Sequence, residues 1–511
     1  MINKITQNIQ NKQFVKILGI NVIMFFCFFG LFVFHKHYST DDYYAYQSQY
    51  AVAVEVTAFS YRNCLGFLYY MLDKIHINVV ENQIIFGAIL LLVFAWCTTI
   101  IVWKINQKIN LEEKVHILCI IELGTIILFA NSFVSEWIWF SLAYVQWIFS
   151  VLGSVYAAII ITRNQNQVKN WFLGLLWLVV VAGTYQIMIA DYVYFVMFFI
   201  FIDMKGRWSK ESFWLIVRAA VPAILSIVLN IVFTNLLSTF GVVPGGLGRM
   251  KLTFSGVRKS LWEIFVFQKK LWIDGIGLLP KYSPFVCLLV LMVILSLVTY
   301  KKVHFLTYFY IFLLCISGQG VMYMAQIMSG TGMNARMLVP IYGTYAILLW
   351  LICYYASSEL EKYNIYRNFA GSMFAAFLVV NIVSIYLNTM DAIKTNTIDK
   401  FYIDEILAHI EDYERRQNTK IMSVGFCRDA NLTYKYYDYI NNRNYHDAIA
   451  YRAFATDWSD YTAFCFYSNR KLERIDVPEQ IKNDFAYQDW IAPDMEKQVV
   501  FEENKVYICI Y

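Results

Sequence analysis

The chain has 511 residues, of which 59% are hydrophobic, 18% aromatic and only 15% charged. This composition is typical of a polytopic membrane protein and excludes an ordinary soluble domain. The seven prolines and 23 glycines, together with the lack of an internal repeat, exclude fibrous and solenoid classes. The ten cysteines show no CxxC or Cys/His spacing, so the sequence indicates no metal site, although it leaves a divalent metal ion open.

Charge is divided unevenly along the chain. Residues 389–511 contain 15 Lys and Arg against 21 Asp and Glu, whereas residues 1–388 contain 27 basic residues against 16 acidic ones. The formal net charge of +5 therefore combines a basic membrane part with an acidic tail. A basic excess in a membrane protein either anchors the protein at anionic headgroups or provides a site for a phosphate, and both interpretations stay open.

The first apolar run spans residues 14–34. Lys4, Lys12 and Lys16 accompany its start, and no small-residue cleavage site follows it. It therefore predicts an uncleaved first membrane segment whose start lies in the cytoplasm. Later apolar segments, each long enough to cross a ~30 Å hydrocarbon core, follow at 84–103, 115–134, 137–161, 213–237, 284–300, 303–325, 337–356 and 369–388.

The longest apolar segment, 171–202, is too long for one span, because as a single helix it would measure about 48 Å. Gly183-Thr184 offers a break near its middle. Two segments satisfy the positive-inside rule, and one segment would violate it. With two, the chain has eleven membrane segments, a cytoplasmic N-terminus and an outer C-terminus, and the inner loops carry Lys104, Lys108, Lys114, Arg163, Lys169, Lys205, Arg207, Lys210, Lys301, Lys302, Lys362 and Arg367.

This topology gathers three larger pieces on the outer side, at 35–83, 238–283 and 389–511. Within the second, residues 257–273 predict an amphipathic helix that lies on the membrane surface. Its basic face either anchors it to headgroups or guides a lipid-phosphate substrate, and consists of Arg258, Lys259, Lys269 and Lys270.

The tail predicts a small α+β domain. A helical pattern over 398–416 precedes a strand-like run at 420–426, and the chain ends in a strand pair at 498–501 and 505–511. The tail shows no catalytic constellation. We therefore divide the chain into a membrane module, 1–388, and an extracytoplasmic α+β domain, 389–511.

Two neighbouring acids, Asp41 and Asp42, follow the first membrane segment in the run Ser39-Thr40-Asp41-Asp42-Tyr43. In a structural interpretation, Ser39 or Thr40 caps a helix and the acids in its first turn favour the helix dipole. In a functional interpretation, one of the acids is a catalytic carboxylate held at the membrane surface, where a lipid-linked substrate can reach it.

Other polar side chains lie near the outer ends of the predicted segments. Asp191, close to Tyr185-Gln186, forms either a structural polar contact or a wall of an outer-facing site, since a charge in the bilayer needs a partner or a wet cavity. Glu136 lies in a tight outer turn on the same side as the acid pair.

Arg336 enters the tenth segment from the outside, four residues before Pro340, which loosens the first helical turn. A guanidinium at this place either anchors the segment at the interface or binds a phosphate through paired, charge-assisted hydrogen bonds.

The acidic pair in the first outer loop, the eleven or so membrane segments and the stretch from Arg336 to Pro340 resemble the GT-C class of membrane glycosyltransferases. Within that class the chain is most similar to the bacterial serotype-converting glucosyltransferases of the Gtr type, through Asp41-Asp42-Tyr43 and, less specifically, Tyr185-Gln186. The resemblance implies that Asp41 or Asp42 activates the acceptor hydroxyl and that Arg336 holds the lipid phosphate of the donor. Family members often carry an arginine soon after the acidic pair, and here the nearest one is Arg62.

We therefore expect an all-α polytopic protein of the bacterial plasma membrane with a small C-terminal α+β domain. Its expected function is to move a hexose such as glucose from a polyprenyl-phosphate donor to a cell-envelope polysaccharide or glycolipid, without a cofactor and without nucleic acid. A polysaccharide polymerase or ligase is a near variant, and a flippase or transporter for a lipid-linked sugar is the alternative class. The expected substrate-binding residues are Arg336, Glu136, Tyr43, Arg62, Tyr185, Gln186, Asp191, Arg258 and Lys259.

Overall fold

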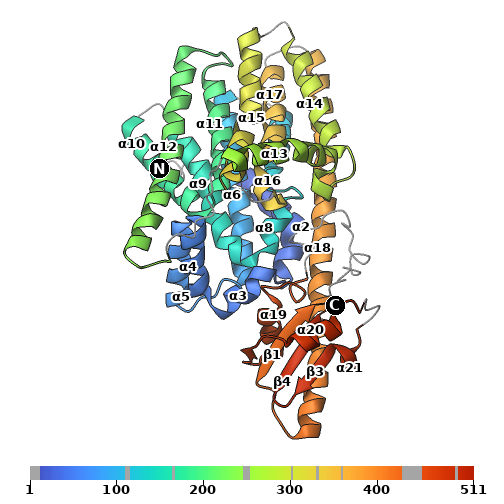
Figure 1. The fold of residues 1–511 in the computed structure, drawn as a ribbon. Helices are drawn as coiled ribbons and strands as arrows, with labels where there is room; N and C mark the ends of the chain where they lie inside the picture. Colours follow the sequence, from blue (N-terminus) through green and yellow to red (C-terminus); the bar gives the residue numbers. More distant parts are fainter. Residues whose placement is uncertain are drawn as a thin grey trace.

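The structure, a computed structural model, describes residues 12–109, 115–163, 167–244, 254–300, 303–329, 333–357, 361–428, 452–488 and 493–510. In this part of the chain the helices form a bundle, and a small domain with a β-sheet lies beyond one of its ends (Figure 1). Four of the basic residues used in the positive-inside argument lie outside the described residues, namely Lys4, Lys114, Lys301 and Lys302.

Nine helices of the described residues are long and apolar enough to cross a membrane, where each backbone polar group must be bonded within the protein. These nine are α2 (Lys12–Phe34), α6 (Gln83–Ile109), α9 (Tyr144–Ile161), α10 (Gln167–Thr184), α11 (Ile189–Asp203), α12 (Lys210–Thr239), α15 (Phe305–Ser329), α17 (Tyr342–Ala356) and α18 (Glu361–Gln417). Short turns precede three of them, namely η1 (Ser141–Ala143) before α9, η2 (Gln186–Met188) before α11, and α16 (Ala335–Leu338) with η4 (Val339–Ile341) before α17. Two shorter apolar helices, α7 (Val115–Ile126) and α14 (Ser283–Thr299), pack into the same core. A helical multi-pass membrane protein is thus confirmed, whereas the count of eleven spans stays a prediction.

The longest apolar segment is divided in two, as the sequence predicts. α10 and α11 meet on either side of Tyr185, whose backbone is extended. Arg218 near the start of α12 donates to Gln167 at the start of α10, and Lys108 at the end of α6 pairs with Asp203 at the end of α11. Because α12 follows α11 closely, the start of α10 and the end of α11 lie at one end of the bundle. The two helices therefore run in opposite directions.

The expected span at 115–134 is shorter than predicted. α7 ends before Asn131, whose side-chain amide donates to the Ile127 carbonyl at 2.8 Å and whose oxygen accepts from two backbone N–H groups that follow it. These bonds satisfy backbone groups that a continuous helix would have paired, so the helix stops there. α8 (Val134–Trp139) then carries Glu136 in a short buried helix and not in the tight turn that the sequence suggested.

The first outer loop, 35–83, folds into three helices, α3 (Thr40–Gln47), α4 (Gln49–Ser60) and α5 (Asn63–Lys74). They lie at the end of the bundle nearest the sheet domain, which we call the cavity end (Figure 1). Tyr61 between α4 and α5 adopts a left-handed conformation with φ 55°, the usual way in which a helix is terminated and the chain redirected. α5 therefore begins immediately after Arg62, next to the end of α4.

α13 (Phe254–Asp274) forms where the amphipathic pattern predicts a helix, and η3 (Gly275–Gly277) follows it. It lies across the bundle and not along it (Figure 1). Leu271 is buried against the core, whereas Trp262, Arg258 and Lys259 are exposed. The helix is confirmed, and its position on a membrane surface stays a prediction.

α18 continues without interruption from the bundle into the C-terminal domain, so the expected boundary after residue 388 falls inside one helix (Figure 1). The sheet has the strand order β2-β1-β4-β3, in which β1 is parallel to β2 and β4, and β3 is antiparallel to β4. Its strands are β1 (Ser423–Arg428), β2 (Glu473–Arg474), β3 (Val499–Glu502) and β4 (Lys505–Ile510), and the helices around it are α19 (Asp460–Ser468), α20 (Glu479–Phe485) and α21 (Met495–Gln498). A small sheet with a closing strand pair agrees with the sequence prediction, and the membrane side of this domain stays a prediction.

The C-terminal domain packs against the first outer loop. The hydroxyl groups of Tyr43 on α3 and Tyr467 on α19 are 2.9 Å apart. The side chain of Asn396 on α18 bonds both backbone groups of Tyr38, at 2.8 and 2.9 Å. Phe466 fills the space between Tyr38 and Tyr43 with ring centroids 4.7 and 5.4 Å away, an aromatic contact of the usual geometry. α3 is therefore held between the bundle and the C-terminal domain.

A membrane-impermeant maleimide should separate the two ends of the bundle in intact cells, because a charged reagent does not cross a ~30 Å hydrocarbon core. We expect labelling of Gln47→Cys and Lys471→Cys, which are exposed on α3 and the C-terminal domain. Lys169→Cys and Lys210→Cys at the opposite end should react only after permeabilisation. The unaltered protein gives the background of the native cysteines. Protection of Lys471→Cys would overturn the outer placement of the C-terminal domain.

Candidate functional site

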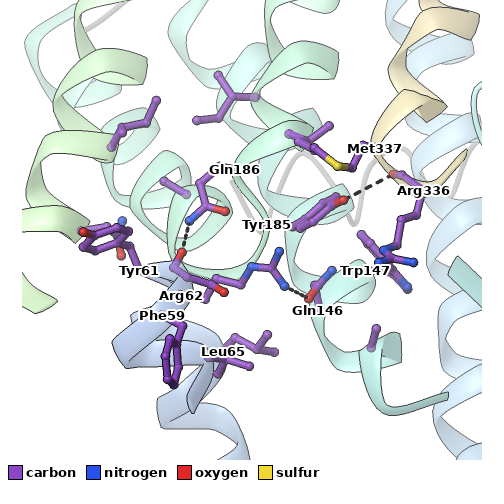
Figure 2. A pocket seen from close by; sticks show the side chains of 18 of the residues that line it. Phe59, Tyr61, Arg62, Leu65, Gln146, Trp147, Tyr185, Gln186, Arg336 and Met337 are labelled. Atoms are coloured by element: carbon purple, nitrogen blue, oxygen red, sulfur yellow. Dashed lines mark hydrogen bonds between the residues drawn. The ribbon is translucent and has the colours of Figure 1, made fainter. Parts of the chain in front are cut away.

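A cavity of about 1310 Å³ lies at the cavity end of the bundle, larger than the ~300–1,000 Å³ of ordinary small-molecule sites. Figure 2 shows part of its lining, where side chains from the first outer loop meet those of the membrane helices. Its charged and strongly polar lining residues include Asp41, Glu55, Arg62, Gln146, Gln186, Asn334 and Arg336. The part of the lining that α12 and α15 contribute is mostly apolar, and we call it the apolar limb. It consists of Ala220, Ala223, Ile224, Ile227, Ile231, Val321 and Met324, with Asn230, Ser317 and Gly320 beside them.

The two neighbouring acids occupy different environments. Successive residues on a helix point about 100° apart, so only one of the pair can face the cavity. Asp41 is exposed and lines the cavity. Asp42 is buried, where one carboxylate oxygen accepts from the backbone N–H and the hydroxyl of Ser39 at 2.8 Å and the other accepts from the backbone N–H of Leu142 at 2.8 Å. Asp42 is therefore a capping residue, and Asp41 is the acid that a ligand can reach.

Burial raises the pKa of the Asp42 carboxyl to about 6, although its hydrogen bonds to Ser39, Leu142 and Ser141 oppose the shift. The desolvation of this carboxylate thus outweighs the hydrogen bonds that it accepts.

Arg62 stands in the middle of the polar lining. One guanidinium N–H donates to the side-chain oxygen of Gln146 at 3.0 Å, and the guanidinium lies 4.9 Å from the centre of the Tyr185 ring, within cation–π range. Gln186 donates to the backbone carbonyl of Ser60 at 2.9 Å and so ties the α10–α11 break to the end of α4 (Figure 2). The first outer loop and the divided segment therefore share one wall of the cavity.

Arg336 reaches the same region from α16. Its backbone N–H donates to the buried carboxylate of Glu136 at 2.8 Å, and its guanidinium is 3.8 Å from that carboxylate. The guanidinium also lies 4.7 Å from the centre of the Phe140 ring. Trp137 and Tyr185 both donate to the Arg336 backbone carbonyl, at 2.9 and 3.4 Å. Glu136 has no exposed surface, so it positions Arg336 and does not contact a ligand itself.

Besides the buried Glu136, four further residues expected to bind substrate do not line this cavity. Asp191 is buried on α11, which turns it into the bundle and not toward the cavity. Tyr43 is buried against Tyr467 and joins α3 to the C-terminal domain. Arg258 and Lys259 are exposed on α13, and Lys259 lies 3.7 Å from Glu263 of the same helix. For all four, the segment that carries the residue could be predicted from the sequence, whereas the direction of the side chain could not.

Sequence reasoning missed several polar or aromatic residues of the lining, among them Glu55, Gln146 and Trp458. Glu55 lies on α4, Gln146 on α9, and Trp458 comes from the C-terminal domain. The spacing between Asp41 and Glu55 does not predict that both line one cavity. Ser48 ends α3, and the chain changes direction there before α4 begins. Trp458 is separated from every other lining residue by a long stretch of sequence, so only the folded chain reveals it.

Among the residues that the structure describes, no three His, Cys, Asp or Glu side chains gather as a metal site requires. The absence of a cofactor stays an expectation. The cavity offers an accessible carboxylate, two guanidinium groups and an apolar limb, an arrangement that suits a ligand with a hydroxyl, an anionic group and a hydrocarbon part.

No family model matches the chain, and no curated protein or solved structure is similar to it.

The buried Asp42 carboxyl should make stability depend on pH. Its folded-state pKa, about 6, lies above its ordinary value of 3.8, so this group stabilises the fold fully below 3.8 and loses that contribution as the pH rises through about 6. Between pH 4 and pH 7, the free energy of unfolding of the wild type should fall by on the order of 3 kcal/mol relative to that of Asp42→Asn. Thermal unfolding in detergent at both pH values measures the difference, with Glu81→Gln as a control. An equal gap between wild type and Asp42→Asn at both pH values would contradict the assignment.

Proposed function

We propose that this protein is a GT-C-type membrane glycosyltransferase that moves a sugar from a polyprenyl-phosphate donor to a hydroxyl of a cell-envelope polysaccharide or glycolipid. The observation that supports it best is one cavity in which an exposed carboxylate, two arginines and an apolar limb meet. Five of its lining residues were expected from the sequence, namely Asp41, Arg62, Tyr185, Gln186 and Arg336.

The apolar limb suits the isoprenoid chain of the donor. α12 and α15 both pack on α11, and between them the side chains of Ile224, Ile227 and Val321 line the cavity. Both helices keep much of their surface outside the protein core, as expected for helices that face lipid. A polyprenyl chain can therefore pass from the bilayer along this limb while its headgroup stays among polar side chains, which removes apolar surface from water at ~25 cal/mol per Å².

The two arginines suit the phosphate of the donor. Arg336 is positioned by Glu136, Trp137 and Tyr185, and Arg62 is steadied by Gln146 and the Tyr185 ring. Guanidinium groups bind phosphate oxygens through paired, charge-assisted bonds. Figure 2 shows both arginines next to Tyr185, so one phosphate beside this ring is the simplest common ligand.

Asp41 is the proposed general base. A sugar hydroxyl is a weak nucleophile, and a carboxylate within hydrogen-bond reach can take its proton as the new bond forms. In the proposed step the acceptor oxygen bonds to the anomeric carbon, the bond from that carbon to the phosphate oxygen breaks, and the electron pair leaves with the polyprenyl phosphate. Arg62 and Arg336 then stabilise the charge that develops on the leaving group.

The nature of the donor is the direct test. Purified protein in lipid nanodiscs should transfer radiolabelled glucose from polyprenyl-phosphate-glucose to a polysaccharide extract of the cell envelope, and should not transfer it from UDP-glucose, because the apolar limb has no partner in a nucleotide. The label in the polysaccharide fraction measures transfer. Heat-treated protein serves as the control. Efficient transfer from UDP-glucose by the purified protein alone would reject the lipid-linked donor.

Asp41→Asn should reduce the turnover number by ~10²–10⁴-fold, because the amide cannot accept the proton. The protein should stay folded, since Asp41 is exposed and Asp42 retains the capping bonds. Glu81→Gln is the matched control, as Glu81 is an exposed acid of the same outer loop that does not line the cavity. Initial rates at saturating donor and a thermal-unfolding curve complete the comparison. Near-normal turnover in folded Asp41→Asn would remove Asp41 from the mechanism and leave Glu55 as the only acid of the described lining.

A further inference from the structure

Trp458 is an exposed tryptophan that the C-terminal domain contributes to the cavity. Its side chain keeps 59% of its surface accessible, and it is the one residue of that domain in the described cavity lining. An exposed aromatic ring that lines a cavity is available to contact a ligand, and aromatic residues are enriched in binding surfaces.

The backbone that carries Trp458 is held firmly on both sides. Arg428 pairs with Asp457 at 2.5 Å and with Asp460 at 2.9 Å. Arg474 pairs with Asp460 at 3.1 Å and donates to the Asp457 carbonyl at 3.3 Å. The two arginines therefore fix the residue before Trp458 and the start of α19 after it. Such a network orders a backbone that would otherwise be free, while the indole between its anchors stays exposed.

The segment that leads to Trp458 is also fixed to α18. Arg452 forms a buried pair with Asp399 of α18 at 2.7 Å, and the other Asp399 oxygen accepts from the backbone N–H of Phe454 at 3.1 Å. The Ser459 hydroxyl donates to the Ala453 carbonyl at 2.6 Å. α18 continues into the bundle. These bonds therefore connect the segment that carries Trp458 to the helices around the cavity.

Trp458 shares the cavity with the first turn of α3. Thr40, Asp41 and Tyr44 line the same cavity, and the Tyr44 ring is itself 39% exposed. α19, which begins two residues after Trp458, packs on α3 through the Tyr43 and Tyr467 hydroxyls. An exposed indole, an exposed phenol and an accessible carboxylate thus line one cavity and are carried by elements that pack against each other.

We infer that Trp458, with Tyr44, forms the subsite that binds the carbohydrate acceptor and presents one of its hydroxyls to Asp41. The C–H face of a pyranose ring packs on an aromatic face, while its hydroxyl groups remain free for polar partners at the ring edge. The assignment of an acceptor rests on the proposed function. A membrane-anchoring tryptophan is the competing explanation, and the polar neighbours Thr40 and Asp41 favour a hydroxyl-rich ligand over lipid.

The experiment compares Trp458→Ala and Trp458→Phe with Trp262→Ala. Trp262 is a matched control, because it is exposed to 66% on α13 and does not line the cavity. The probe is polysaccharide extracted from the envelope of the cells that naturally produce the protein, and binding is followed without donor by co-sedimentation with protein-loaded nanodiscs. We expect Trp458→Ala to weaken binding about tenfold, Trp458→Phe to recover most of it, and Trp262→Ala to bind as the wild type does.

The binding result and the transfer result answer different questions. Equal binding by wild type and Trp458→Ala, or no polysaccharide binding by the wild type, would overturn the subsite. Equal loss of polysaccharide binding by Trp458→Ala and Trp262→Ala would show that the effect does not come from the cavity, and would also overturn the subsite. In the transfer assay we expect Trp458→Ala to raise the KM for the polysaccharide about tenfold and to leave the KM for the donor within about twofold. Failure of the wild type to transfer sugar would reject the proposed function and leave the binding comparison to decide the subsite.

Discussion

The buried carboxylate of Asp42 is the interaction on which the arrangement of the cavity depends. It accepts from Ser39 at the start of α3 and from the backbone of Leu142 in the turn before α9, so it joins the first outer loop to the bundle across a long distance in sequence. Burying a carboxylate is costly unless its oxygens are hydrogen-bonded, and here both are. These bonds set the direction of α3. They therefore also set the direction of Asp41, which directly precedes Asp42 in the chain and lines the cavity.

The membrane helices are interrupted where they reach the cavity. Tyr185 separates α10 from α11, Phe140 separates α8 from η1, and Arg336 lies in a short helix before Pro340. Irregular backbone is tolerated at membrane depth only where it is buried in protein or lines a wet cavity, because lipid offers no hydrogen-bond partners. At these breaks, side chains take over the missing bonds, as when Trp137 and Tyr185 donate to the Arg336 carbonyl. Of these two side chains, Tyr185 also lines the cavity, so one residue both bonds the free carbonyl and brings a polar group to the site.

The sequence was informative where a pattern has one structural solution. The helical membrane part, the break between α10 and α11, the amphipathic α13 and the closing strand pair all follow from hydrophobic periodicity and charge. It could not separate Asp41 from Asp42, because both suit a cap and both suit a base until the partners of α3 are known. Asp191 shows the same limit, since a polar residue in an apolar segment indicates a polar environment without naming it. Tyr43 shows it too, because its partner Tyr467 lies far away in the sequence. The position of Trp458 at the cavity could not be predicted from the sequence, because it depends on how α18 places the C-terminal domain.

In the proposed reaction, negative charge moves through the cavity while the total stays constant. The phosphodiester of a polyprenyl-phosphate sugar carries one negative charge, and the polyprenyl phosphate that leaves carries two when the proton remains on the base. Asp41 loses its charge as it takes that proton, so one unit of charge passes from α3 to the group beside Arg62 and Arg336. Arg62 is held by two neutral groups, the Gln146 side chain and the Tyr185 ring. Arg336 is held by the Glu136 carboxylate, 3.8 Å from its guanidinium. Fixed cations strengthen their interaction with a leaving group as its charge grows, which lowers the barrier more than it tightens donor binding. The separation of the base on α3 from the cations just before α5 and on α16 is therefore the feature that would let this cavity accelerate transfer and not merely bind a lipid-linked sugar.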